Sequence, residues 1–355
     1  MQYIGLDLHS KSFTLTVLDE QGGVLWSVTR ATSGEQLVRQ VTAVAGSKTI
    51  AVEEGTLADW AFRLLSPHAK VLVCDPRTNR WIAGDEKIDD HVAARKLAEL
   101  LRAGLLQPVH HSESAERQAF KELVAAYHDL TKQLTRYKNK IKARFRGRAI
   151  ACPGAAVYAA QGRETWVAKL PGEGCRLEIQ LLYDTLDHLE GQRQDLLGHI
   201  NRLSRQFVQV ERFQQLPGVG PIRAATFYAV IDTPQRFRTK GKLWSYCGIG
   251  IARQTSGQTQ GPEHLTRFGN RVLKNVLKGA ALTAISLGDN PFAAKYRRQI
   301  GKGIAPELAR LSVARSIANT LWTLWRRDEE YDPDRADCWD AGVRDKGQSQ
   351  RQRLP

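Results

Sequence analysis

The chain has 355 residues, with 52 Lys or Arg against 37 Asp or Glu, which gives a formal net charge of +15. This length allows two or three domains with their own cores, and the positive charge favours a polyanionic partner over a neutral small molecule. The five cysteines are scattered without metal-ligand spacing, as expected in a reducing cytosol. We expect a cytoplasmic protein, because no apolar run has membrane-spanning length and no signal peptide fits before the first strand.

The first 110 residues predict an α/β domain. Alternating apolar residues over 2–30 predict three strands, with turns at His9–Ser10 and Gln21–Gly23. Further along the chain, a strand, a helix, a strand and a helix are predicted at 48–54, 57–65, 70–75 and 94–106. Three strands followed by alternating helix and strand predict a mixed sheet flanked by helices, an order that resembles an RNase H-like (RuvC-like) domain.

Residues 111–210 show apolar side chains at alternating intervals of three and four, the seam of a coiled coil. The first run contains Phe120, Leu123, Tyr127, Leu130, Leu134, Tyr137 and Ile141. After a break containing Gly and Pro at 147–174, the second run contains Leu182, Leu186, Leu189, Leu196, Ile200, Leu203 and Phe207. We expect two long helices in a coiled-coil region, paired with each other or with another subunit.

The remaining sequence predicts a compact, mainly helical domain over 211–330. Its last element is an amphipathic helix at 308–325, and the small polar residues of 252–261 predict a loop between helices. Residues 331–355 are charged and nearly free of aliphatic side chains, so we expect a disordered tail.

Several carboxylates fall where the predicted sheet ends. Asp7 lies inside the first strand, where a buried charge is costly unless it is paired or binds a metal. Glu53 and Glu54 end the strand expected beside it, and Asp89 and Asp90 begin the last helix of the domain. We interpret them as a candidate site for Mg²⁺ ions. Helix capping and solvent exposure are the alternatives for all except Asp7.

Stretches in both halves of the chain resemble the Piv-like DEDD transposases. In the first half these are "YIGLDLHSKSF", "VEEGTLADWAFRLL", "VCDPRTNRWIA" and "DDHVAARKLAELLRAGLL". In the second half they are "LPGVGPIRAATFYAVI", "RFRTKGKLWSYCGI", "RQTSGQTQG" and "TRFGNRVLKNVLKGAA". The resemblance covers residues 2–110 and 211–285. It implies an insertion-sequence recombinase of the bacterial cytosol or nucleoid that uses Mg²⁺, a structured guide (bridge) RNA, and donor and target DNA.

Carried over residue by residue, the resemblance makes Asp7 the first acid of the site. Glu54 takes the second place, since Glu54-Gly55-Thr56 matches the family's E-x-T, and Glu53 is the alternative. The third and fourth acids of the family are three residues apart at a helix start. Alignment on the following Ala-Arg-Lys-Leu-Ala makes Asp90 the third and leaves Ala93 in the fourth place.

A fourth carboxylate is missing in the other register too, where Asp89 is the third acid and Val92 fills the fourth place. We interpret Ala93 as replacing an Asp, through deliberate inactivation or natural change. The alternative is that Asp89 substitutes for the missing acid.

The resemblance also assigns the nucleophile to Ser256, which precedes Gly257, with Thr255 as the second choice. Without that resemblance, Thr-Ser-Gly is ordinary loop chemistry. The turn "LPGVGP" resembles a helix-hairpin-helix, in which Gly218 and Gly220 would offer backbone N–H groups to a phosphate. A simple turn between helices is the alternative.

Basic residues gather in two segments. The first contains Arg136, Lys138, Lys140, Lys142, Arg144, Arg146 and Arg148, and we expect it to contact structured RNA. The second extends from Thr233 to Gly288, where Glu263 is the one acid; the candidate nucleic-acid contacts in it are Arg253, Arg267, Arg271 and Lys274. A solvated helix surface is the alternative for the first segment.

These features favour an RNA-guided DNA recombinase that acts as a homodimer or tetramer without a membrane partner, since recombination must hold two duplexes. One alternative is a RuvC-like nuclease that uses metal-activated water and forms no covalent intermediate. The other is a catalytically inactive nucleic-acid-binding protein, which the missing fourth acid allows.

Overall fold

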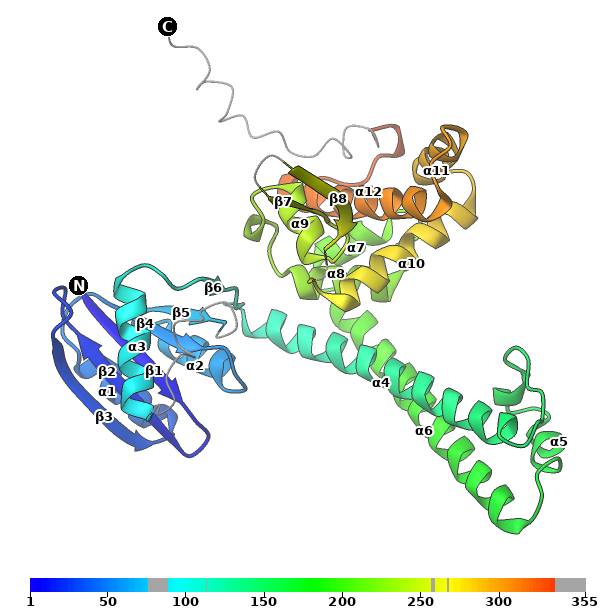
Figure 1. The fold of residues 1–355 in the computed structure, drawn as a ribbon, viewed down its shortest axis with the longest axis horizontal. Coiled ribbons are helices and arrows are strands. Elements are labelled where there is room, and N and C mark those ends of the chain that lie inside the picture. Colours follow the sequence, from blue (N-terminus) through cyan, green and yellow to red (C-terminus); the bar gives the residue numbers. More distant parts are fainter. Residues whose placement is uncertain (76–88, 113, 257–258, 267, 336–355) are drawn as a thin grey trace, which may run out of the picture. The chain divides into compact units, whose positions relative to one another are not determined.

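A computed structural model describes residues 1–75, 89–112, 114–256, 259–266 and 268–335, with the backbone alone over the strands of 252–264. The chain separates into two compact units, residues 1–113 and 114–355 (Figure 1). Among the described helices, none combines the length and the apolar character needed to cross a membrane.

The first unit is built on a six-stranded mixed sheet with the order β3-β2-β1-β4-β5-β6. β1 is antiparallel to β2 and parallel to β4. The strands are β1 (Gln2–Leu8), β2 (Ser12–Leu18), β3 (Val24–Ala31), β4 (Lys48–Glu53), β5 (Lys70–Cys74) and β6 (Pro108–Val109). The predicted meander and both later strands are therefore confirmed. The two-residue β6 was not predicted, because it is too short to carry a pattern.

Helices cover both faces of this sheet (Figure 1). α1 (Gly34–Ala43) and α2 (Ala58–Leu65) pack on one face, where Ile4 and Leu6 join their core. α3 (Asp90–Arg102) crosses the other face. Since side chains alternate along a strand, Gly5 and Asp7 belong to the face that α3 covers. Asp7 thus lies at the end of the central strand, beside the start of α3.

The second unit contains two long helices that pack along each other, α4 (Ala115–Arg146) and α6 (Glu173–Ser204). This confirms the two predicted helices and shows them paired within one chain. Their connection contains η1 (Ala156–Tyr158) and α5 (Arg163–Val167). The predicted seam missed Tyr183, which is buried and donates from its hydroxyl to the carbonyl of Val157, 2.8 Å away. The connection therefore packs onto the helices.

The helical pair shares a core with the C-terminal region. Phe120 and Val124 of α4 and Ile200 of α6 lie in the same buried cluster as Trp322. The remaining helices of this core are α7 (Val208–Gln214), α8 (Pro221–Ile231), η2 (Pro234–Arg236), α9 (Lys240–Tyr246), α10 (Arg271–Leu287), α11 (Pro291–Gly301) and α12 (Pro306–Arg327), followed by η3 (Pro333–Arg335). The expected compact helical region and its final amphipathic helix are present.

The structure corrects two expectations in this unit. The segment predicted as a loop forms a hairpin of β7 (Ile251–Ser256) and β8 (Thr259–Leu265). Its residues lack the alternation of apolar and polar side chains that identifies a half-buried strand. The ordered chain also continues past the predicted start of the tail, because the Tyr331 ring stacks on Phe292 with centroids 6.4 Å apart. The rest of the predicted tail, 336–355, lies outside the described residues.

Candidate metal and nucleic-acid sites

Asp7 and Asp90 come together at the edge of the sheet in the first unit. The Nε2 atom of His9 lies 3.3 Å from an Asp7 oxygen and 4.0 Å from an Asp90 oxygen. One potential ligand atom from each of the three residues falls within 4.8 Å of the others. Two of the three predicted acids are thus neighbours, although 83 positions separate them in the sequence (90 − 7).

The first turn of α3 explains why Asp90, and not Asp89, reaches this place. Asp89 is the N-cap of α3, and its carboxylate accepts the backbone N–H of Val92 at 2.8 Å. The capping alternative is therefore confirmed for Asp89, whose carboxylate is engaged in holding the helix start. Asp90 is the first helical residue, on the same helix face as the buried Ala94 and Leu97.

The second acid beside Asp7 is Glu53. β1 and β4 pair in register, with Leu6 opposite Val52, so Asp7 and Glu53 are adjacent and share the α3 face. Burial is the main cause of the raised pKa of Glu53, and the negative charge of Asp7 raises it further. Asp7 behaves in the same way: burial raises its pKa, the charge of Asp90 adds to the effect, and His9 opposes both.

Glu54, the residue assigned by the sequence, takes a different partner. Its Oε2 atom lies 2.8 Å from Nε2 of His111, whose Nδ1 is 3.1 Å from an oxygen of Asp59. His111 lies between these two carboxylates, with a side chain 9% exposed. Because adjacent strand residues point to opposite faces, a shift of one residue decides which glutamate joins Asp7. The structure therefore places Glu53, the alternative from the sequence, beside Asp7, and places Glu54 beside His111.

Ala93 stands where the fourth acid of the family is expected. It is half-buried and three residues after Asp90, so both lie on the helix face that packs on the sheet. A carboxylate at this position would face the same edge as Asp7. Position 93 therefore lies where a fourth acid of the family would be expected, but its side chain is a methyl group.

A ladder of hydroxyl groups beside Asp7 escaped the sequence analysis. Oγ1 of Thr16 bonds Oγ of Ser27 at 2.8 Å, and Thr14 bonds Thr29 at the same distance. His91, next to Asp90, bonds Ser27 at 2.8 Å and Thr29 at 3.2 Å. The ladder therefore ties the first turn of α3 to β3. Thr14 and Thr16, which alternate along the buried strand β2, are the feature of the sequence from which this ladder could have been predicted.

The donor set at this edge fits a hard divalent cation. Asp7 and Asp90 offer carboxylate oxygens close to each other, and Glu53 adds a third carboxylate next to Asp7; such oxygens are the ligands that Mg²⁺ prefers. His9 would act as a hydrogen-bond partner of Asp7, since Mg²⁺ sites rarely use imidazole.

Ser256 is the last residue of β7 and pairs with Thr259 at the tip of the hairpin. Ile251 and Leu265 pair at its base. For Arg253, Thr255 and Ser256 the structure describes only the backbone, and Gly257 and Arg267 lie outside the described residues. The predicted nucleophile is thus presented on a hairpin tip.

The two glycines of the "LPGVGP" turn differ in their surroundings. Gly218 has a φ of +84°, and a Cβ on it would lie 2.2 Å from the carbonyl oxygen of Ala280 in α10. Its absent side chain therefore lets α10 approach the turn. Gly220 precedes α8 with a φ of −77° and has open space around it. Of the two glycines predicted to contact phosphate, Gly218 is therefore needed for packing against α10, whereas a Cβ atom on Gly220 would meet no other atom within 4 Å.

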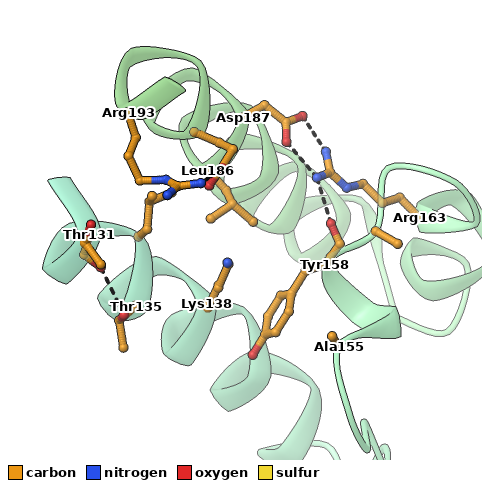
Figure 2. Close-up of a pocket in the computed structure, with 12 residues that line it drawn as sticks. Thr131, Thr135, Lys138, Ala155, Tyr158, Arg163, Leu186, Asp187 and Arg193 are labelled. Atoms are coloured by element: carbon orange, nitrogen blue, oxygen red, sulfur yellow. Dashed lines mark hydrogen bonds and ion pairs between the residues drawn. The ribbon is translucent and has the colours of Figure 1, made fainter. Parts of the chain in front are cut away.

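One residue of the basic segment of α4, Lys138, lines a groove of about 560 Å³ between α4, η1 and α6 (Figure 2). Lys138 projects into it beside Tyr158, with Nζ 5.8 Å from the ring centroid, and Lys142 approaches the same ring to 5.3 Å. Across the groove, Arg163 binds both carboxylate oxygens of Asp187, at 2.5 and 2.7 Å. This pairing holds the pKa of Asp187 below its usual value.

Other residues of the basic segment also have partners within the unit. Arg144 donates to Glu178 at 2.6 Å, and Arg148 donates to the carbonyl of Arg144 at 2.8 Å. Lys140 lies 4.6 Å from the ring of Tyr137. Arg136 and Arg146 are exposed, as is Arg271 in the second basic segment, where Lys274 is half-buried.

Comparison with known proteins agrees with both halves of the chain. A family model for DEDD transposases of IS110, described as "Transposase", matches residues 4–147. A second, described as "Transposase IS116/IS110/IS902 family", matches residues 210–297. The chain belongs to the IS110 family of DEDD transposases.

Curated relatives span different shares of the chain. The "Insertion element IS116 uncharacterized 44.8 kDa protein" of Streptomyces clavuligerus is 27% identical over 50% of this chain, which covers 45% of that relative. A "Probable family 20 transposase" of Pseudomonas aeruginosa is 24% identical over 93% of the chain and 98% of the relative. The "Transposase for insertion sequence element IS1111A" of Coxiella burnetii is 20% identical over 93% and 91%. The chain thus spans less than half of the first relative.

Proposed function

We propose that this protein is the recombinase of an insertion sequence, and that it cuts and rejoins donor and target DNA under the guidance of a structured RNA. The observation that carries this proposal is the meeting of Asp7 and Asp90 at one sheet edge, with Glu53 beside Asp7 on the neighbouring strand, in a chain of this family. The order β3-β2-β1-β4-β5, with β2 antiparallel to its neighbours, supports an RNase H-like fold for the first unit.

In this proposal the acidic residues hold Mg²⁺ and Ser256 supplies the nucleophile. Mg²⁺ bound there would offset the charge of the reacting phosphate and of the oxygens that attack and leave. The serine Oγ forms a bond to phosphorus as one phosphorus–oxygen bond of the DNA backbone breaks. The hydroxyl proton passes in the net reaction to the leaving oxygen, and rejoining reverses both changes. No external energy source is needed, because one phosphodiester replaces another.

Covalent trapping tests the nucleophile. We would incubate the Ala93→Asp protein with Mg²⁺, its copurified RNA and a plasmid carrying the element, and stop the reaction with denaturant. The proposal predicts a protein–DNA adduct that disappears in Ser256→Ala and persists in Thr255→Ala. Cut DNA without an adduct would instead support the hydrolytic nuclease, and intact DNA would support an inactive binding protein.

RNA guidance and assembly are tested by two separate measurements. Sequencing the RNA that copurifies with the protein should return one structured species, whereas random cellular fragments would contradict guidance.

The proposed homodimer or tetramer follows from the need to hold two duplexes. Light scattering of the protein bound to RNA and DNA should therefore show more than one subunit per complex, and a single subunit would overturn this part.

A further inference from the structure

Phe268 carries an exposed aromatic ring close to the hairpin. Its side chain is 87% exposed, and it is the one exposed aromatic residue among those whose side chains the structure describes. The next most exposed large apolar residue in the described part is Leu287, at 63%. Scattered aliphatic residues are common on protein surfaces, but a fully presented ring offers two flat faces for stacking.

The backbone on both sides of Phe268 is held in place. Before it, the N–H of Thr266 donates to the carbonyl of Gly250 at 3.0 Å. After it, Gly269 has a φ of +141°, and a Cβ there would lie 2.6 Å from the backbone of Gly248. The exposure of the ring therefore follows from an anchored loop, and the ring contributes little to the core.

Basic side chains lie beside this loop and on the helix that follows it. The side chain of Lys274 packs over Gly248, at 3.4 Å from the position of a Cβ atom, so it meets the segment on which the Phe268 loop rests. Arg271 and Lys278 are exposed on the same helix, α10. Between residues 233 and 288 the sequence contains one acid, Glu263. An aromatic ring beside cations is the usual composition of a single-strand binding surface.

We propose that Phe268 stacks on an unpaired base of the DNA strand that is cut, with Lys274 near the backbone of that strand. This inference rests on the proposed function, which it extends by a contact away from the reacting phosphate. The six residues of β7, from Ile251 to Ser256, span about 17 Å. Since Phe268 follows the base of the hairpin and Ser256 ends at its tip, the stacked base lies several nucleotides from the attacked phosphate.

Affinity measurements in Ser256→Ala protein test the contact without any strand transfer. Phe268→Ala should bind oligo(dT) roughly 5- to 150-fold more weakly, with an unchanged dependence on salt. Phe268→Trp should retain affinity. Lys274→Gln should instead reduce the slope of log affinity against log salt by the amount that corresponds to about one lost phosphate contact. Leu287→Ala, the matched loss of an exposed apolar side chain on α10, should change neither quantity.

Photo-crosslinking locates the contact. Oligo(dT) carrying 5-iododeoxyuridine should yield an adduct on Phe268 in the peptide map, and Phe268→Ala should unfold at the same temperature as the parent. Affinity within twofold of the parent in Phe268→Ala, or no adduct on the loop, overturns the proposal. Preferential loss of binding to an oligo(U) RNA would overturn the assignment to DNA. Because both readouts omit strand transfer, their failure is distinguishable from a failure of recombination at Ser256.

Discussion

A Cβ atom on Gly5 would lie 1.8 Å from the carbonyl oxygen of Ala94, so β1 and α3 meet backbone to backbone. This contact lets the start of α3 reach the sheet edge, where Asp90 comes close to Asp7. The glycine two positions before the first acid thus positions a second acid that is distant in the sequence.

Replacing Gly5 by Ala should therefore disturb both stability and metal binding. Overpacking of a well-packed contact typically costs about 1–3 kcal/mol, and here the obstacle is backbone, so we expect the upper end of that range or more. Urea unfolding measures the loss. Gly34→Ala is the control, since its Cβ would meet side chains at an ordinary 3.6 Å. Equal stability of the two variants would contradict the account of this contact.

The two glycines of the turn before α8 should respond differently to the same substitution. Gly218→Ala adds a Cβ 2.2 Å from the Ala280 carbonyl at a φ of +84°, so we expect a loss of about 2 kcal/mol or more. Gly220→Ala has open space and a negative φ, so its stability should stay within about 0.5 kcal/mol. Thermal unfolding of both variants decides this, and similar losses would be inconsistent with Gly218 as the packing residue.

Restoring a carboxylate on α3 should restore catalysis. We expect the protein with Ala93 to bind nucleic acid but to transfer strands on the order of a thousandfold more slowly than Ala93→Asp, because the missing ligand corresponds to several kcal/mol of transition-state stabilisation. Val92→Asp is the control, since it adds the acid to the neighbouring, 37% exposed position. Strand transfer at a normal rate without the substitution, or rescue by Val92→Asp alone, would favour the register with Asp89.

Neutralising the basic face of α4 should weaken RNA binding. Changing Lys138, Lys140 and Lys142 to Gln should reduce the slope of log affinity against log salt by about 0.7 to 0.9 per lost phosphate contact. Lys132→Gln, on the same helix outside the basic segment and paired with Asp129 at 3.8 Å, is the control. An unchanged slope in the triple variant would remove this segment from the RNA interface.

Much of the fold was predictable because its elements have strong periodic patterns. The apolar residues of β1 and β2 and the seam from Phe120 to Ile141 belong to faces that are buried in the structure. The polar hairpin of β7 and β8 has no such pattern, and its pairing is a property of the backbone. Tyr331 likewise belongs to the fold through Phe292, a contact that no local composition reveals.

The candidate site was predictable as a set of acids but not as a geometry. Asp7 and Asp90 were identified because a carboxylate in a strand and one at a helix start are conspicuous. The choice between Glu53 and Glu54 depends on which face of β4 each side chain takes, and on His111, which draws Glu54 away. The pairing of two strands decides that face, and a single glutamate pair in the sequence does not encode it.

Metal binding to single variants of the protein tests the central claim most directly. With Mn²⁺ as the paramagnetic probe and Mg²⁺ as the competitor, Asp7→Asn and Asp90→Asn should lose binding, and Glu53→Gln should weaken it at least tenfold. Glu54→Gln should bind as the parent does, because that carboxylate pairs with His111. Loss of binding in Glu54→Gln with retention in Glu53→Gln would contradict the geometry of the site, and unchanged binding in Asp7→Asn would contradict the site itself.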